Sequence, residues 1–445
     1  MAHIRSPHPS EFQAMQTYLF PPKIQPNQSW FEALQRGFEF SAGSGWPDRF
    51  GKQMRIWFKG QPIRTLSLFS GGGGLDIAFH DAGFQIQHAV EIESAFARTL
   101  QQNSGHGRWF PSTTVHNVDV CDFTLDEEID FIIGGPPCQT FSAAGLRQGT
   151  DDPRGRLFEE YVRLLKSLRP RGFLFENVYG ILGTQRGEVW CQIQEAFRAA
   201  GYVLHWRVLD AADYGVPQHR ERVFIVGLRD DLANTDFLFP YPCHGPDSPG
   251  QQPYYTAGQA TEGVDTSHMK LGINGHHGHL LDDIPPGLNY SFYTQKMKHP
   301  RPVFGWRTKF SDYLYKADPN RPVRTICAQP GQYTGPFSWK NRLFSLGELK
   351  RLQTFPDDYQ IYGGRGVTLK QIGNSVPPQV GRILALAIRD QLYQTPLPIQ
   401  IPYMSPGHPL YFRQRKRALT TEYRECAAQA IRHQRKQGHF TCLND

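Results

Sequence analysis

The chain has 445 residues, of which 39% are hydrophobic and whose formal net charge is +7; this length exceeds one compact core, so two or three domains are expected. No apolar run is long enough to span a membrane, no secretory signal pattern opens the chain, and the basic balance is compatible with nucleic-acid binding. The seven cysteines are scattered without a CxxC pair, which argues against a disulfide framework or a structural metal site and favours a reducing, cytoplasmic compartment.

Changes in composition and in the pattern of expected strands and helices divide the chain into five segments. Residues 1–60 are mixed and aromatic-rich, and we interpret them as an N-terminal extension. Residues 61–229 alternate strand and helix patterns, and residues 230–320 form an irregular module rich in Gly, Pro, His and Tyr. Residues 321–394 return to the earlier pattern, and residues 395–445 form a basic tail.

Alternating strands and helices predict an α/β fold with a doubly wound, mostly parallel sheet. The expected strands are Thr65–Phe69, His88–Ile92, Ile129–Ile133, Phe173–Phe175 and Val223–Val226. The expected helices are one from Leu75 to near Gly83, one ending at Leu100, and then Leu157–Leu168, Val189–Ala200, Leu346–Phe355 and Val380–Tyr393.

The first expected strand runs into FSGGGGLD, residues 69–76. Glycines let the backbone turn tightly and approach a ligand closely, and Asp76 falls in the first turn of the next helix. Glu91 ends the second strand about twenty residues later, where an acid can bind ribose hydroxyls. The alternative is a plain glycine turn with a solvated Glu91, and the pattern does not separate NAD from S-adenosylmethionine.

A cysteine follows another expected buried strand in GGPPCQTFS, residues 134–142. Two glycines and two prolines break the strand, so Cys138 stands on a stiff turn at the edge where open α/β sheets bind ligands. A lone cysteine in such a segment is more often a small buried hydrophobe. Its assignment therefore depends on other motifs.

Three polar motifs come later in the chain. ENV, residues 176–178, places Glu176 at a strand end, where it can share an edge with Cys138. Arg220 and Arg222 in QHRER point the same way if that segment is extended. QIGNSVPP, residues 371–378, is interpreted as a polar turn before the last apolar helix. Separately, these motifs could be a solvated acid, surface arginines and a helix cap.

Together and in this order, FSGGGG, PPCQTFS, ENV, QHRERVFIVG, RPVRTI and QIGNSVPP resemble the motifs of the C5-cytosine DNA methyltransferases. The resemblance covers about residues 65–228 and 321–392 and implies a Rossmann-like methyltransferase sheet, with a target recognition domain at 230–320. The implied activity is DNA (cytosine-5-)-methyltransferase. It transfers a methyl group from S-adenosyl-L-methionine to carbon 5 of a cytosine in a short sequence of double-stranded DNA.

The resemblance also assigns catalytic roles. Cys138 is implied as the thiolate that adds to carbon 6 of a cytosine flipped out of the duplex. Glu176 is implied at N3 of the base, Arg222 at its O2, and Arg220 at the catalytic loop and a DNA phosphate. Asn177 would orient the loop that carries Cys138. Residues 142–149 are similar to the family's mobile loop that closes over the flipped base.

For the methyl donor, the resemblance implies that Phe69 contacts the adenine face, Glu91 the ribose and Asp119 the adenine amine. S-adenosyl-L-homocysteine would be the product. Asp119 is followed closely by Asp122, and Asn117 replaces a glycine common in the family. The remaining implied cofactor contacts are Gly71, Gly73, Gly74, Pro137, Leu157, Asn374 and Ser375.

The recognition module has many residues that could read base edges or phosphates. They are Lys270, Asn274, His276, His277, His279, Gln295, Lys296, Lys298, Arg301 and Arg307. No metal is expected at the His cluster. The tail, with Arg432, Arg435 and Lys436, is either a solvated helix or a phosphate-contacting one, and phosphate contacts would make DNA binding salt-dependent.

The resemblance implies a bacterial or phage enzyme, monomeric or weakly dimeric, that protects DNA beside a cognate restriction endonuclease. Three alternatives remain at this point. They are a methyltransferase acting on RNA, which would lack the CFT-type motif of the tRNA-directed branch, an inactive DNA-binding protein, and an NAD oxidoreductase suggested by the glycine turn alone.

Overall fold

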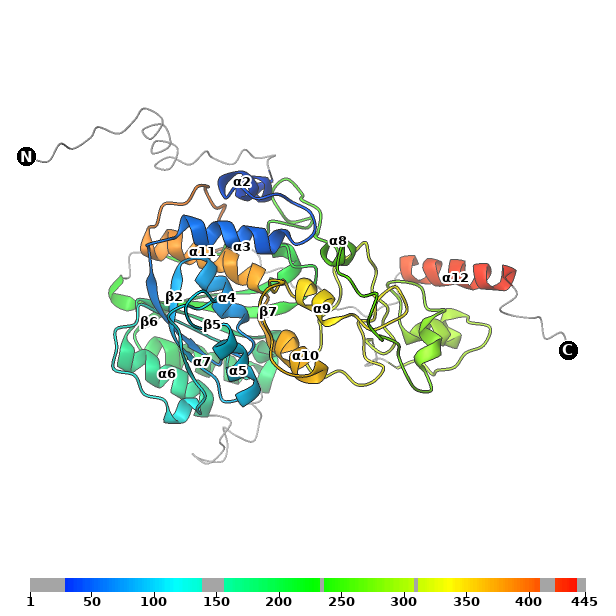
Figure 1. Ribbon diagram of the computed structural model, residues 1–445, viewed down its shortest axis with the longest axis horizontal. Helices are drawn as coiled ribbons and strands as arrows, with labels where there is room; N and C mark the ends of the chain where they lie inside the picture. Colours follow the sequence, from blue (N-terminus) through cyan, green and yellow to red (C-terminus); the bar gives the residue numbers. More distant parts are fainter. Residues whose placement is uncertain (1–28, 138–155, 233–235, 308–310, 409–420, 438–445) are drawn as a thin grey trace, which may run out of the picture.

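The computed structural model describes residues 29–137, 156–232, 236–307, 311–408 and 421–437. Figure 1 shows a large domain built around one twisted sheet, with a smaller lobe of mostly irregular backbone beside it. Within the described residues, no helix is both long and apolar enough to cross a membrane.

One seven-stranded sheet forms the centre of the large domain, with the strand order β3-β2-β1-β4-β5-β7-β6. The strands from β3 to β5 in this order pair in parallel, and β7 pairs antiparallel with both β5 and β6. The strands are β1 (Ile63–Leu68), β2 (Phe84–Val90), β3 (Thr114–His116), β4 (Phe131–Gly134), β5 (Gly172–Val178), β6 (Tyr202–Asp210) and β7 (Glu221–Arg229). The predicted mostly parallel α/β sheet is confirmed.

Helices connect the parallel strands and cover both faces of the sheet. The α-helices are α2 (Trp30–Gly37), α3 (Trp46–Trp57), α4 (Gly74–Asp81), α5 (Ser94–Gln102), α6 (Arg156–Leu168), α7 (Glu188–Ala199), α8 (Ala257–Thr261), α9 (Leu346–Leu352), α10 (Arg365–Asn374), α11 (Pro378–Tyr393) and α12 (Thr421–Lys436). Short 3-10 helices are η1 (Val120–Asp122), η3 (Tyr179–Gly187), η4 (Ala211–Tyr214), η5 (Asp230–Leu232), η6 (Gly278–Leu281), η7 (Tyr290–Tyr293) and η8 (Gln295–Met297).

The central strands are buried on both faces, as parallel strands between helices must be. In β4, Phe131 and Ile133 join the apolar cluster on the side of α3, α4 and α11, whereas Ile132 joins the cluster on the side of α6 and α7. These two helix layers lie on opposite sides of the sheet in Figure 1. The sheet is therefore packed against helices on both faces, which fixes the positions of its strand ends.

Some elements differ from the expectation. β6 lies at the sheet's edge and mixes half-exposed polar residues such as His205 and Arg207 with apolar ones, which hides its strand pattern. Residues 371–374 are not part of a polar turn but end the helix α10, and only Ser375–Pro377 separate α10 from α11. The prediction of a turn was wrong there because Gly373 is packed against the backbone of Ala328 inside a helix, where glycine is usually unfavourable.

The N-terminal helices α2 and α3 pack into the same apolar cluster as the sheet. Phe31, Trp46 and Phe50 are almost fully buried, and Trp46 stacks on His244 with ring centroids 5.7 Å apart. The described part of the expected N-terminal extension thus covers one face of the large domain. The domain boundaries themselves stay a prediction.

A buried ion network fixes α3 to the rest of the domain. Asp81 and Arg382 are both 0% exposed, and Arg382 Nε and Nη2 each lie 2.7 Å from Asp81 Oδ2. Arg55 of α3 binds the other oxygen of Asp81. The network joins α3 and α4 to α11, which follows about 300 residues later in the sequence.

We predict that Asp81→Ala destabilises the protein by about 3–5 kcal/mol, because it leaves the Arg382 guanidinium buried without its counter-charge. Urea denaturation followed by circular dichroism measures this change. Glu128→Ala is the control, since Glu128 is an exposed partner of Arg64 and its loss should cost less than about 1 kcal/mol. Equal stability of the two variants would contradict a structural role for the buried network.

The smaller lobe has an apolar cluster of its own. Ile284, Phe292 and Leu314 are fully buried there, and Ala427 and Ile431 of α12 complete the cluster. The described part of the basic tail therefore contributes a helix to this lobe.

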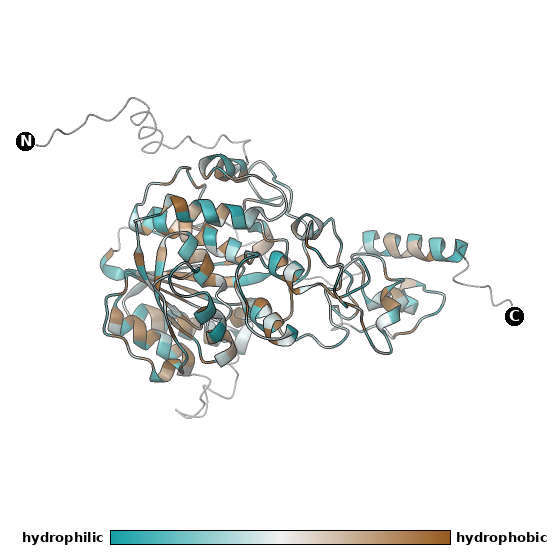
Figure 2. Ribbon diagram, viewed as in Figure 1, coloured by the Kyte–Doolittle hydropathy of each residue, from teal (hydrophilic) through white to brown (hydrophobic). Residues whose placement is uncertain are grey.

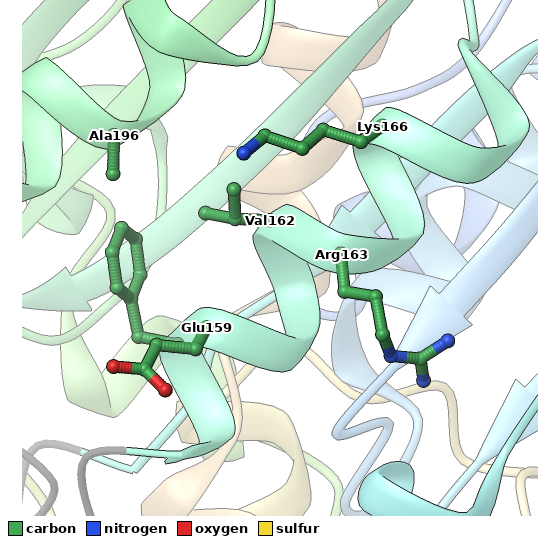
Figure 3. Close-up of a pocket in the computed structure, with 6 residues that line it drawn as sticks. Glu159, Val162, Arg163, Lys166 and Ala196 are labelled. Atoms are coloured by element: carbon green, nitrogen blue, oxygen red, sulfur yellow. The ribbon is translucent and has the colours of Figure 1, made fainter. Parts of the chain in front are cut away.

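A pocket of about 380 Å³ opens on the outer surface of α6 and α7 (Figure 3). Its lining residues are Phe158, Glu159, Val162, Arg163, Lys166 and Ala196. Arg163 is already bonded to Glu160 and to the Phe123 carbonyl. The remaining charges are mixed in sign, so the pocket has no set of groups that indicates a ligand.

Candidate active site

The carboxyl ends of β1, β2, β4 and β5 meet at one edge of the sheet. The antiparallel strand β7 begins at this same edge, because Arg222 pairs in register with Val178 at the end of β5. The sequence motifs at these strand ends are therefore brought together, as expected for ligand sites in open α/β sheets.

Glu176 and Arg222 form a buried ion pair at this edge. Arg222 Nε lies 3.0 Å from Glu176 Oε1, and both side chains are less than 15% exposed. Burial raises the pKa of Glu176, and the positive charges of Arg222 and Arg220 only partly oppose this shift. The carboxyl group can therefore hold a proton at a higher pH than a solvated glutamate does.

Arg220 is 2% exposed and holds the C-terminal end of α10 in place. Its Nη2 donates to the carbonyls of Gly373 and Asn374, at 2.8 and 3.2 Å. Its Nε and Nη1 have no hydrogen-bond partner among the described residues. Burial lowers the pKa of this guanidinium well below its usual value, and Arg222 adds to the effect. Arg222 is paired with Glu176, and the charge of Arg220 also acts on that carboxyl group; that the two arginine side chains point the same way stays a prediction.

The turn that leads to Cys138 lies directly on Glu176. A Cβ added at Gly135 would be 2.7 Å from Glu176 Oε2, so only glycine allows this approach. Asn177 Nδ2 donates to the Pro136 carbonyl at 3.1 Å and holds the turn in place. Pro137 is exposed; Cys138 and the expected mobile loop, residues 142–149, lie outside the described residues.

The glycine turn between β1 and α4 is held by Glu91. Its two carboxylate oxygens accept the N–H groups of Gly71 and Glu93, at 2.7 and 2.8 Å. Phe69 and Gly73 both have positive φ, +54° and +84°, and Gly73 leaves no room for a side chain beside the Tyr359 hydroxyl. Burial raises the pKa of Glu91, and the two N–H groups oppose this shift.

The other residues predicted to contact the cofactor include some beside the glycine turn and one at the start of α6. A Cβ at Gly72 would lie 3.2 Å from Ser375 Oγ, so Ser375 borders the glycine turn, and Gly74 packs against the Val376 backbone. Leu157 lies at the start of α6 and packs against the second apolar cluster.

Two more predicted contacts lie on the connections around the turn. Asp119 caps η1 by accepting the Cys121 N–H at 2.9 Å, and Asn374 is the exposed last residue of α10. The structure thus groups Ser375 with the glycine turn, and it places Asp119 on the connection after β3.

The sequence interpretation missed two features of this edge. Ile92 was expected inside a strand, but β2 ends at Val90 and the Ile92 side chain is 60% exposed beside Glu91. Asp76 is 1% exposed, and burial raises its pKa to about 7 although hydrogen bonds from Ser67 and Ser70 oppose this shift. Exposure and burial are properties of the folded chain, so no sequence pattern showed them.

Comparison with known proteins decides the family. Residues 63–390 match the family model described as C-5 cytosine-specific DNA methylase. The chain belongs to this family. The resemblance stated from the motifs is confirmed, and the protein is a DNA (cytosine-5-)-methyltransferase.

Related methyltransferases match the sequence of this chain over most of its length. It is 33% identical over 374 residues to the type II methyltransferase M.SacI of Streptomyces achromogenes, which covers 74% of this chain and 93% of that protein. It is 35% identical over 321 residues to M.NgoFVII of Neisseria gonorrhoeae, covering 71% and 83%. A crystal structure assigned as a DNA modification methyltransferase encoded within an E. coli prophage has a TM-score of 0.53 and 25% identity, covering 74% of this chain and 99% of that one.

Among the described residues, no group of three or more His, Cys, Asp or Glu side chains is arranged to hold a metal ion. In the His cluster of the smaller lobe, His277 has other partners. His277 Nδ1 bonds to the Tyr313 hydroxyl, and its ring lies 5.1 Å from that of Phe304.

Proposed function

We propose that this methyltransferase methylates carbon 5 of a flipped cytosine through a covalent bond between Cys138 and carbon 6. Carbon 5 of cytosine is a poor nucleophile, and addition of a thiolate at carbon 6 makes it enamine-like. Cysteine suits this step because its thiolate is strongly nucleophilic near neutral pH. After transfer, loss of the carbon 5 proton expels Cys138 and restores the ring.

Glu176 and Arg222 have complementary roles in this proposal. Negative charge develops on the pyrimidine as the thiolate adds, and a protonated Glu176 at N3 neutralises it. Arg222 donates to the cytosine O2 and holds the Glu176 carboxyl in position, 3.0 Å from its own Nε. Arg220 organises the catalytic loop, for which its buried Nε and Nη1 donors have no other partner among the described residues. Its assignment to a DNA phosphate comes from the family resemblance alone.

One observation carries this proposal. Gly135 touches the Glu176 carboxyl, and Asn177 holds the Pro136 carbonyl, so the backbone reaches the acid immediately before Cys138. A nucleophile and an acid that act on neighbouring ring atoms must lie on such a shared edge. The ordinary alternative, a small buried cysteine, gives no reason for a buried ion pair beside the turn.

The glycine turn fits a nucleoside cofactor, and we assign it to S-adenosyl-L-methionine, which supplies an electrophilic methyl group when bound. A Cβ at Gly71 would meet almost open space, whereas Gly73 and Gly74 pack against Tyr359 and Val376, so we assign the methionine part to the open side of this tight turn. The Glu91 carboxylate, which is fixed beside the turn by the Gly71 N–H, is assigned to the ribose. Ser375 borders this turn, and Pro137, Leu157 and Asn374 are assigned to the rest of the site.

The adenine would lie between apolar side chains. Phe69 is half-buried at positive φ where β1 ends, and Ile92 is the exposed apolar residue beside Glu91. Asp119 is assigned to the adenine amine from the connection after β3. Ile92 is thus added to the predicted set because of its exposure next to the ribose-binding acid.

The smaller lobe is assigned as the target recognition domain for double-stranded DNA. Because its named relatives are type II methyltransferases, we assign the enzyme to a restriction–modification system with a cognate endonuclease. The proposed enzyme acts as a monomer or weak dimer in the cytoplasm of a bacterium.

Base-resolution mapping of 5-methylcytosine in plasmid DNA from cells expressing the chain tests this function. We expect methylation at every copy of one short sequence and none elsewhere. The experiment also identifies the recognition sequence. Absence of the mark from plasmid DNA, with methylation of cellular RNA in the same cells, would replace the DNA substrate by RNA.

A further inference from the structure

α12 has one apolar face and one basic face. Ala427 and Ile431 are buried in the apolar cluster of the smaller lobe, whereas Arg432, Arg435 and Lys436 are exposed. Figure 2 shows this division as alternating brown and teal bands along the helix, which lies on the lobe at the right of the view. The helix is therefore attached to the lobe by one side only.

Specific hydrogen bonds fix the position of α12 on the lobe. The Asn289 N–H donates to the Tyr423 hydroxyl at 3.0 Å, and that hydroxyl donates to Asn289 Oδ1 at 2.8 Å. Near the other end, Gln434 Nε2 donates to the Asp283 carbonyl at 3.1 Å. Bonds at both ends, about three turns apart, orient the helix and therefore its basic side chains.

The exposed charge is concentrated in the second half of α12. The acids Glu422 and Glu425 both lie in its first half, and Glu422 is paired with Arg321. Arg432, Arg435 and Lys436 have no ion-pair partner among the described residues. Three unpaired cations on a fixed scaffold therefore remain available to an anionic partner.

A neighbouring element adds to this positive surface. α12 contacts η8 (Gln295–Met297), where the exposed Lys296 lies 4.2 Å above the ring of Trp306. Lys298 follows it and is also exposed. Two exposed lysines thus lie on or next to a segment that packs against α12.

We infer that α12 is a phosphate-binding extension of the recognition domain, which contacts the DNA backbone beside the recognition sequence through Arg432, Arg435 and Lys436. The inference rests on the proposed function, since the lobe must hold duplex DNA. Contacts to phosphates add affinity without reading bases, and they release counterions. The partner is thus duplex DNA of any sequence, and a helix about 24 Å long spans several of its phosphates.

Basic residues at a helix C-terminus also stabilise the helix dipole, so the test must separate stability from DNA binding. The variant Arg432→Gln/Arg435→Gln/Lys436→Gln removes three charges from the exposed face and leaves the apolar face intact. The matched control Arg36→Gln/Lys59→Gln/Lys166→Gln removes three exposed charges from the large domain. These three lie on or beside α2, α3 and α6, away from the lobe in Figure 1.

The probe is a random-sequence duplex a few helical turns long, and its Kd is measured over a range of salt concentrations by fluorescence anisotropy. We expect the slope of log Kd against log salt to become shallower by about 2–3 for the α12 variant, since each lost phosphate contact removes about 0.9. The control variant should keep the wild-type slope. Circular dichroism melting checks that α12 remains folded.

A wild-type slope in the α12 variant, or an equal change in the control, would overturn the inference. If the triple variant does not fold, Arg432→Gln alone should lower the slope by about 1, and Arg432→Lys should leave it unchanged. Failure of the proposed function gives a different result, because the wild-type protein itself would then neither bind the duplex nor methylate plasmid DNA.

Discussion

Replacing Cys138 by alanine is expected to lower the methylation rate at least about 1,000-fold, because no other group can add to carbon 6 of the cytosine. Binding of S-adenosyl-L-methionine should change little. The glycine turn and Glu91, which we assign to that cofactor, are held by β1, β2 and the Gly71 N–H, and they do not depend on the thiol. Cys138→Ala should therefore separate chemistry from cofactor binding.

Two measurements test this separation. Transfer of tritium-labelled methyl groups to plasmid DNA reports turnover, and isothermal titration calorimetry with S-adenosyl-L-methionine reports binding. Cys327→Ala is the matched control, since the half-buried Cys327 lies close enough to Arg220 to influence its pKa. This variant should retain most of the wild-type activity. If Cys138→Ala loses cofactor binding as well, Cys138 is a structural residue.

The motifs predicted which residues meet at the carboxyl ends of the strands, because those residues stand at strand ends. Once the sheet is parallel, Glu91 and Glu176 must lie at one edge, and the antiparallel β7 brings Arg222 to Glu176. Short sequence patterns were enough for these positions. The chemistry of Cys138, which lies outside the described residues, came from the family resemblance and stays a prediction.

Contacts between distant segments could not be predicted in the same way. Asp81 and Arg382 form a fully buried pair although about 300 residues separate them, and neither stands in a recognisable motif. Likewise, α12 shows only a weak apolar pattern, and its place on the lobe depends on Tyr423 meeting Asn289. The sequence left the tail open between a solvated and a phosphate-contacting helix because single helices do not show what they pack against.

Glu176→Gln is expected to slow methyl transfer by about 100- to 10,000-fold with little loss of DNA affinity. Glutamine fills nearly the same space and can still bond to Arg222, but it cannot supply a proton to N3 of the cytosine. Glu221→Gln, at the start of the neighbouring strand β7, is the control and should stay near the wild-type rate. Single-turnover transfer with pre-bound DNA measures the chemical step, and anisotropy measures the affinity.

The pH dependence gives Glu176 a more specific test. Burial raises the pKa of Glu176, so its protonated form persists above the usual range for a carboxyl group, and it is lost as the pH rises through that raised pKa. The wild-type single-turnover rate should therefore fall on the alkaline side. In Glu176→Gln this alkaline fall should disappear, because the amide does not titrate, while the dependence on the Cys138 thiolate at low pH remains. An unchanged alkaline limb would assign the required proton to another group and leave Glu176 only the role of positioning Arg222.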